Sequence, residues 1–394
     1  MRPDERSCSL RMAAVQSPII PVIADLARHH PGTISLGQGV VFYGPPPAAL
    51  VAAREYGNTP EQHRYGPVRG QPDLLEAISR KLWEENHIRV GAGRRLMVTA
   101  GANMAFLNAI LAIADVGHEI ILPLPYYFNQ EMAIRMLGCQ PVFVPTDATY
   151  QLRLDALRQA ITPRTRAIVT ISPNNPTGAV YPETDLRAVN ALCHEHGLYH
   201  ISDEAYEYFT WGDARHFSPA SIEGAETHTI ALYSLSKAYG FASWRIGYQV
   251  IPEHLDAALL KAQDTNLICA PLISQAAATA ALGAGRDYSE AYRNSMAQVR
   301  QLVLRELEAV RDCCQMPTPQ GAFYLLMKVD TGMDSLKLAK LLITEHGVAV
   351  IPGMAFGLSD GCYLRIAYGA LEPESARTGI RRLVQGLQSL VSEG

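Results

Sequence analysis

Short apolar runs alternate with helix-like patterns over the middle of the chain. Seven of these runs are expected to be strands: residues 97–100, 119–124, 141–145, 166–172, 198–202, 229–234 and 246–250. They are apolar on both faces, which is typical of a parallel sheet that helices cover on both sides. The segments between them carry helical periodicity, and one of these, residues 183–197, ends at Gly197. The alternation predicts an α/β layer sandwich.

The pattern changes after Pro271. Long helical patterns cover residues 274–285 and 289–312, and a mixed region of strands and helices then leads to a last helical pattern over residues 376–391. A chain of 394 residues is long enough for two packed domains. We predict an N-terminal segment (1–45) that packs with a small C-terminal α+β domain (286–394), and a large domain between them (46–285).

Composition and charge exclude several classes of protein. The net charge is −4 with both signs mixed along the chain, so no strongly basic surface is expected for nucleic acid or an anionic membrane. No apolar run approaches the roughly 20 residues that span a bilayer, and the first residues do not resemble a secretion signal. The seven cysteines are scattered without the spacing of a disulfide framework. These features predict a cytoplasmic protein.

The segment from Ser234 to Gly247, SLSKAYGFASWRIG, carries the strongest chemical signal. Lys237 follows directly after an expected buried strand, where desolvation lowers the pKa of an amine and makes it a nucleophile toward carbonyl groups. Arg245 supplies a guanidinium fork that suits a phosphate. A lone Ser-x-Ser-Lys is more often a surface segment, so the hypothesis depends on the residues around it.

Three other segments place polar groups at the ends of expected strands. Asp203 and Tyr206 follow the strand 198–202, at the edge where α/β sheets bind ligands, although a helix cap and a core aromatic would look the same. Asn175 lies in a turn after the strand 166–172 and could equally be a loop residue. The turn at Gly101 precedes a helix whose first N–H groups, around Ala102 and Asn103, suit an anion.

These motifs together resemble one family. In their order and spacing they are similar to the class I/II aminotransferases, which are pyridoxal-phosphate (PLP) enzymes of fold type I, and the likeness extends from about residue 34 to residue 369. One departure is Ser243, where the family usually has glycine or asparagine. The resemblance implies a large domain with a mostly parallel seven-stranded sheet in an α/β/α sandwich, plus a smaller α+β domain. The residues that carry it are Gly101, Ala102, Asn103, Asn175, Pro176, Thr177, Gly178, Asp203, Ala205, Tyr206, Ser234, Lys237 and Arg245.

The resemblance also assigns roles around the cofactor, pyridoxal 5'-phosphate. Lys237 would carry it as a Schiff base and then act as general base and acid, Asp203 would pair with the ring nitrogen, and Tyr206 would bind the ring oxygen together with Asn175. Tyr127 would stack on the ring. The phosphate would be held by Gly101, Ala102, Asn103, Ser234, Ser236 and Arg245, and by Tyr65 of a neighbouring subunit. The match of Tyr65 implies a homodimer with shared active sites.

Further matches concern the substrates, an amino acid and a 2-oxo acid. Arg365 lies in an expected strand, where the family uses an arginine to bind the α-carboxylate with two hydrogen bonds. The backbone of Gly39 borders the same carboxylate, and Asn175 is expected to contact the substrate as well as the ring oxygen.

The substrate side chain is predicted from a few positions. Related bacterial aspartate aminotransferases have a lysine for the distal carboxylate where this chain has the neutral Asn103. An apolar and aromatic pocket is expected instead, which favours aromatic or methionine-like amino acids. The expected lining is Val41, Phe42, Tyr43, Tyr126 and Tyr127.

Three alternatives remain open from the sequence. An aspartate aminotransferase could use Arg69, or a residue of the partner chain, for the distal carboxylate. A PLP-dependent C–S lyase would share every cofactor motif. A non-catalytic ligand-binding module of the same fold belongs to a different class, and the presence of Lys237 argues against it.

Overall fold

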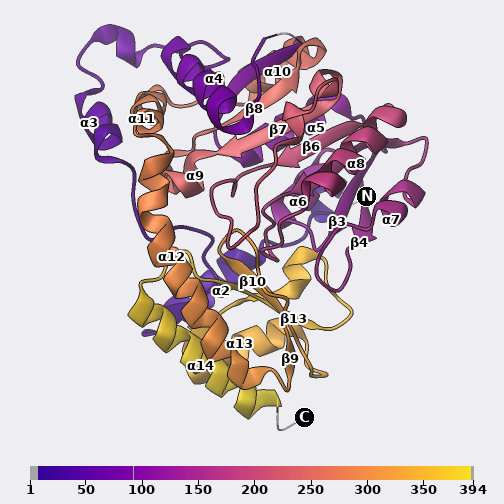
Figure 1. Ribbon diagram of the computed structural model, residues 1–394, viewed down its shortest axis with the longest axis vertical. Helices are drawn as coiled ribbons and strands as arrows, with labels where there is room; N and C mark the ends of the chain where they lie inside the picture. Colours follow the sequence, from indigo (N-terminus) through magenta and orange to yellow (C-terminus); the bar gives the residue numbers. More distant parts are fainter. Residues whose placement is uncertain (1–7, 92, 392–394) are drawn as a thin grey trace, which may run out of the picture.

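The computed structural model describes residues 8–91 and 93–391. Within these ranges, none of the helices is long and apolar enough to cross a membrane. Two sheets dominate the structure, one in the upper and one in the lower half of Figure 1.

The larger sheet has seven strands in the order β2-β8-β7-β6-β5-β3-β4. Only β8 runs antiparallel to its neighbours, so the sheet is mostly parallel, as expected. All seven strands coincide with the seven apolar runs, with ends that differ by a few residues. Their bounds are β2 (Arg94–Thr99), β3 (Glu119–Leu124), β4 (Gln140–Pro145), β5 (Thr165–Ile171), β6 (Tyr199–Asp203), β7 (Thr229–Ser234) and β8 (Gly247–Pro252).

Helices cover both faces of this sheet because successive strand residues point to opposite sides. Ile230 and Leu232 belong to a core cluster with α5 (Ala102–Ile113), α6 (Phe128–Met136) and α10 (Asp256–Asn266). Ala231 and Tyr233, one residue along, belong to a cluster with helices of the other layer. That layer contains α3 (Pro47–Glu55), α4 (Pro72–Asn86), α7 (Leu154–Gln159), α8 (Glu183–Glu195) and α11 (Leu272–Gly283).

The smaller sheet has four antiparallel strands in the order β12-β13-β10-β9. They are β9 (Cys314–Gln315), β10 (Tyr324–Val329), β12 (Ile351–Pro352) and β13 (Cys362–Ala367). Helices α13 (Ser335–His346) and α14 (Pro373–Val391) pack beside it, and the long helix α12 (Gly285–Leu307) joins this part to the upper half of Figure 1.

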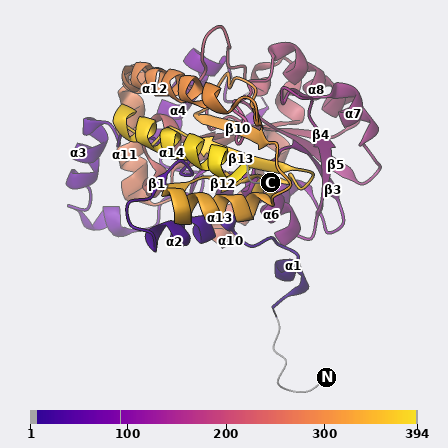
Figure 2. The same ribbon diagram turned by 90° about the horizontal axis from the view of Figure 1, so that it is seen from below.

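Part of the N-terminal segment packs against this smaller part. Strand β1 (Ile34–Ser35) pairs in parallel with β11 (Val348–Ala349), and α2 (Ile19–Arg28) contacts α13. Helix α1 (Leu10–Ala13) lies at the edge of the molecule in Figure 2 and contacts α6 (Phe128–Met136). The domain bounds at residues 45 and 285 stay a prediction.

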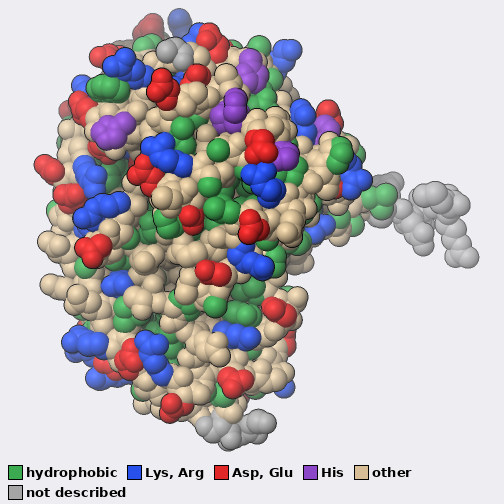
Figure 3. Space-filling view, turned by 45° about the vertical axis from the view of Figure 1, so that its right-hand side comes forward, with side chains coloured by type: hydrophobic (Ala, Val, Ile, Leu, Met, Phe, Trp, Pro, Cys, Tyr) green, Lys and Arg blue, Asp and Glu red, His purple; other side chains and the backbone are tan. Residues whose placement is uncertain are grey.

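Shorter helices complete the described chain. They are α9 (Leu235–Ala238) and the 3₁₀ turns η1 (Pro60–His63), η2 (Pro219–Ser221), η3 (Ala225–Thr227), η4 (Ala242–Trp244), η5 (Glu253–Leu255), η6 (Glu308–Val310) and η7 (Gly353–Phe356). On the face shown in Figure 3, acidic and basic side chains are interspersed and neither sign forms a large patch.

Candidate active site

A cavity of about 100 Å³ lies at the carboxyl ends of β5, β6 and β7. This is the edge where ligands bind in open α/β sheets. Most of its lining was predicted from the sequence. Ala205 was named there only as part of the motif around Asp203, and Ile171 was not named, because nothing distinguishes it from a core residue. The lining consists of Ala102, Asn103, Tyr127, Ile171, Asn175, Asp203, Ala205, Tyr206, Ser234, Ser236, Lys237 and Arg245.

Lys237 lies on the short helix α9, directly after β7. Ser234 caps this helix, since its hydroxyl accepts a hydrogen bond from the backbone N–H of Ser236. The Lys237 Nζ donates to the carbonyl oxygen of Gly39 at 2.5 Å. Burial lowers the pKa of Lys237 to about 8, and the positive charges of Arg365 and Arg245 act in the same direction. About a tenth of the amine is therefore neutral at pH 7, far more than for an ordinary lysine, and the neutral form is the nucleophile.

Asp203 is the last residue of β6 and is buried. Its Oδ2 accepts from Nε2 of Gln130 at 2.8 Å, and its Oδ1 accepts from the backbone N–H of Ala205 at 3.2 Å. Burial raises the pKa of Asp203 to about 6. The negative charge of this carboxylate is costly to bury alone. A protonated ring nitrogen of a ligand beside it would compensate that charge. No sequence pattern singles out Gln130, which positions this carboxylate.

We predict that Asp203→Asn stabilises the cofactor-free protein above pH 6. The pKa of Asp203 lies above its ordinary value of 3.8 in the folded state, so folding is favoured by protonation and this carboxylate destabilises the fold as the pH rises from about 4 to 6. The neutral amide removes that penalty, about 1–3 kcal/mol by the size of the shift. Gln130 can turn its amide to receive the new NH₂ group, because its Oε1 has no partner among the described residues.

The measurement is urea unfolding of the cofactor-free protein from pH 5 to pH 8. The gain of the variant should shrink toward pH 5, whereas exposed Asp213→Asn should show no such trend. A variant that is less stable than the native chain at pH 8 would contradict the argument.

Arg365 is fully buried in β13, and its guanidinium is only partly satisfied. Nη1 donates to Oδ1 of Asn175 at 2.9 Å and Nη2 donates to the carbonyl of Gly37 at 2.7 Å. The Nε has no partner, and none of the described acidic side chains forms an ion pair with this arginine. A buried cation without a counter-ion is costly, so the site is suited to an anion. A substrate carboxylate meets that need.

The opposite end of the cavity is suited to a phosphate. Helix α5 begins at Ala102, and Gly101 caps it at φ 84° without a side-chain hydrogen bond, which leaves the first backbone N–H groups for an anion. The guanidinium of Arg245 packs directly against Gly101, and a side chain at that position would collide with it. Its Nη1 donates to the carbonyl of Ala242 at 2.9 Å, which fixes the side chain.

Comparison with known proteins decides the family. Residues 31–383 match the family described as aminotransferase class I and II. The chain belongs to this family. It is 35% identical to an aromatic aminotransferase of Arabidopsis thaliana over 98% of both chains, and 35% identical to an aspartate aminotransferase of Pyrococcus abyssi over 91% of this chain and 92% of that one.

Solved structures agree with the family and the fold. The aromatic aminotransferase from Pyrococcus horikoshii superimposes with a TM-score of 0.85 and 34% identity, over 93% of this chain and 99% of that chain. The aspartate aminotransferase from Thermus thermophilus with maleate superimposes with a TM-score of 0.89 and 32% identity, over 97% of this chain and 100% of that chain. Class I and II aminotransferases use pyridoxal phosphate, and the chain is an aminotransferase of fold type I. The amine with a lowered pKa, the buried carboxylate and the uncapped α5 N-terminus fit this cofactor.

The residues expected around the substrate side chain lie in different surroundings. Among the five residues expected around the substrate side chain, Tyr127 alone lines the described cavity. Tyr126 instead stacks on Phe143, and Tyr43 stacks on Tyr292 with ring centroids 4.0 Å apart. These aromatic rings are used in packing because helix and loop segments from elsewhere in the chain cover them, which a local pattern does not reveal. Val41 and Phe42 join the same core cluster as Tyr43.

Two further positions lie apart from the cavity. Arg69 forms a two-point ion pair with Asp256, in which Nη2 and Oδ2 are 2.7 Å apart. Its charge is therefore compensated within the chain. Tyr65 is 82% exposed, so its proposed contact needs a second subunit.

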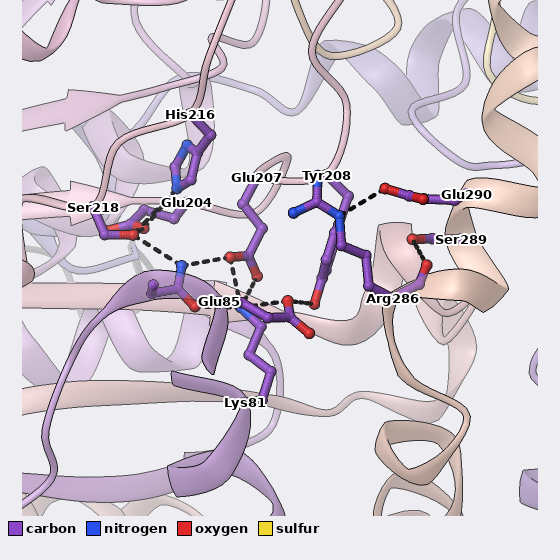
Figure 4. A network of polar contacts seen from close by, with 11 residues as sticks. Lys81, Glu85, Glu204, Glu207, Tyr208, His216, Ser218, Arg286, Ser289 and Glu290 are labelled. Atoms are coloured by element: carbon purple, nitrogen blue, oxygen red, sulfur yellow. Dashed lines mark hydrogen bonds and ion pairs between the residues drawn. The ribbon is translucent and has the colours of Figure 1, made fainter. Parts of the chain in front are cut away.

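A buried polar network, which includes Glu204 directly after Asp203, ties helix α4 to the loop that follows β6 (Figure 4). Its acidic groups Glu204 and Glu207 and the imidazole of His216 lie close enough for a metal ion. However, the ammonium of Lys81 already binds both carboxylate oxygens of Glu207 at 2.6 Å. We interpret the network as structural: it fixes the backbone next to Asp203. Its other members include Asn86 and Ser218, which connect Glu207 to Glu204 by hydrogen bonds.

Proposed function

We propose that this aminotransferase moves an amino group between an aromatic or methionine-like L-α-amino acid and a 2-oxo acid. The observation that carries the proposal is the charge of the site. Among the described residues that line the cavity, the cations are Lys237 and Arg245, which have roles in holding the cofactor. Arg365 is suited to the α-carboxylate. Arg69 is paired with Asp256, and the described lining of the cavity holds no further cation for a second carboxylate.

Asn103 supports the same choice of substrate. It lies in the first turn of α5, and a hydrogen bond from its side chain to the Tyr127 hydroxyl partly offsets the rise that burial causes in the Tyr127 pKa. The neutral amide also carries no charge that could pair with a second carboxylate. Aspartate remains the second candidate, because relatives at similar identity are named both aromatic and aspartate aminotransferases.

The residues of the chain divide the reaction between them. We propose that Arg365 binds the α-carboxylate and so orients the α-carbon toward Lys237, which removes and returns its proton. Asp203 keeps the ring nitrogen protonated, while Tyr206 and Asn175 donate to the ring oxygen. Bound pyridoxal phosphate supplies the electron sink for the charge released at the α-carbon. The phosphate is held by Gly101, Ala102, Asn103, Ser234, Ser236 and Arg245.

The test is a steady-state comparison of phenylalanine, methionine, aspartate and glutamate as amino donors. We expect phenylalanine or methionine to have the highest kcat/KM. If aspartate exceeds both by about tenfold, a difference of about 1.4 kcal/mol in transition-state binding, the substrate proposal is wrong.

Asn103→Lys is expected to raise kcat/KM for aspartate relative to phenylalanine by about 10-fold or more, since a charge-assisted hydrogen bond contributes roughly 1.5–3 kcal/mol. The ratio of the two kcat/KM values is the measurement. Exposed Asn58→Lys adds the same charge far from the cavity and should leave the ratio unchanged. An unchanged ratio in Asn103→Lys would show that this position does not face the substrate side chain.

We further propose a homodimer in which Tyr65 completes the partner's phosphate site. The exposed position of Tyr65 supports this assembly. Neither Lys237→Ala nor Tyr65→Ala should be fully active alone, but co-expressed subunits of the two variants should form hybrid dimers with one native site. Recovery of activity above that of both parents supports shared sites, and a monomer by sedimentation excludes them. We also propose that the protein works in the cytoplasm. The support is that all seven cysteines are free, as is usual in a reducing compartment.

A further inference from the structure

Two buried tyrosines meet where the larger and smaller parts of the chain join. Tyr206 follows β6, and Tyr324 is the first residue of β10, 118 positions later. Their hydroxyl oxygens are 2.8 Å apart, and their rings meet edge to face at 80°. Tyr206 lines the cavity, whereas Tyr324 lies behind it. The sequence analysis did not single out Tyr324.

The direction of this hydrogen bond follows from the available acceptors. The Tyr324 hydroxyl has one proton to donate. Among the described residues, its only hydrogen-bond partner is the Tyr206 hydroxyl. On another side it packs against Gly39, where even a Cβ atom would collide with the hydroxyl. A buried hydroxyl proton without an acceptor is costly. Tyr324 therefore donates and Tyr206 accepts.

Tyr206 then has only one place for its own proton. Its oxygen accepts from Tyr324 and also from Nδ2 of Asn175 at 3.3 Å. With both lone pairs used, its O–H points away from these two donors and into the cavity that it lines. Donation to its oxygen also polarises the O–H group and strengthens it as a donor.

We propose that Tyr324 is a positioning residue that directs the Tyr206 proton toward the ring oxygen of bound pyridoxal phosphate. This inference rests on the proposed role of Tyr206. The placement of Tyr324 is fixed independently of the cofactor, because its ring lies 4.7 Å from the Arg365 guanidinium on the neighbouring strand β13. The same side chain thus touches the group for the α-carboxylate and the group for the ring oxygen.

The experiment is a pH titration of the visible absorption of the bound cofactor in Tyr324→Phe. Phenylalanine keeps the ring against Arg365 and removes the hydroxyl alone. A donor to the ring oxygen favours its ionised form, so a weaker donor should raise the apparent pKa of the absorption change, by about half a pH unit for a partly lost hydrogen bond. The affinity of the cofactor-free protein for pyridoxal phosphate should fall about 2- to 5-fold, for the same reason.

A double-mutant cycle separates this role from a general structural one. In Tyr206→Phe, the added change Tyr324→Phe should produce no further shift, because its effect passes through the Tyr206 hydroxyl. Tyr368→Phe is the matched control: Tyr368 is a buried tyrosine of the same part of the chain, and its hydroxyl has no partner among the described groups. It should leave the titration unchanged.

The outcomes distinguish the two proposals. If Tyr206→Phe shifts the titration and Tyr324→Phe does not, the present inference is wrong and the role of Tyr206 stands. An equal shift from Tyr324→Phe in both backgrounds would also overturn it. If Tyr206→Phe itself causes no shift, the assignment of Tyr206 to the ring oxygen fails, and the role of Tyr324 fails with it.

Discussion

Replacement of Lys237 by alanine is expected to lower kcat by at least about 10⁴-fold. The variant loses the group that transfers the proton, for which general acid–base catalysis alone contributes roughly 10²–10⁴-fold, and it also loses the covalent attachment of the cofactor. No other described amine lines the cavity and could replace it. The measurement is kcat with the best amino donor at saturating pyridoxal phosphate, together with dialysis of the cofactor.

Lys237→Ala should release its cofactor on dialysis, and the native enzyme should retain it. Lys261→Ala removes an exposed lysine from α10 and serves as the control, with kcat expected to be unchanged. Turnover within 10-fold of the native rate (about 1.4 kcal/mol) in Lys237→Ala would overturn the central assignment.

Replacement of Arg365 by alanine should reduce kcat/KM by about 10²- to 10³-fold, since loss of one partner of a buried charged pair costs about 2–5 kcal/mol. The reduction should be the same for all amino acids, because the α-carboxylate is common to them. The kcat/KM of Arg365→Lys should lie between those of the native enzyme and Arg365→Ala, since lysine keeps the charge but not the planar pair of donors. The measurement is kcat/KM for at least one aromatic and one dicarboxylic donor.

Arg381→Ala is the matched control for this substitution. Arg381 is an exposed arginine of α14 that pairs with Glu306, and its removal should not change kcat/KM. A loss confined to dicarboxylic donors in Arg365→Ala would mean that Arg365 binds the side-chain carboxylate instead.

Local sequence patterns predicted the strands well. Most strands of the larger sheet are runs of apolar residues on both faces, and such a run is stable only when helices cover both sides. The residues at the strand ends, such as Asp203 and Lys237, were found because the carboxyl ends of parallel strands meet at one edge of the sheet. The roles of these residues came from the family resemblance, and their catalytic assignment stays a proposal.

The tertiary structure decided what local patterns could not. Gln130 beside Asp203 and Tyr324 beside Tyr206 are separated from their partners by 73 and 118 positions, so no local periodicity links them. For a related reason, local patterns did not reveal that Tyr43 stacks on Tyr292 and that Tyr126 stacks on Phe143.

The sequence by itself therefore determined the α/β layers and the polar residues that gather at one edge of the sheet, because backbone geometry and apolar burial are encoded locally. Only the tertiary structure decided the charge state of these groups and which of them have hydrogen-bond partners. It lowers the pKa of Lys237 and raises that of Asp203 by burial, and it leaves the Nε of Arg365 without a described partner. Desolvation and hydrogen bonding depend on what surrounds a group in space, and most of those neighbours are distant in the chain.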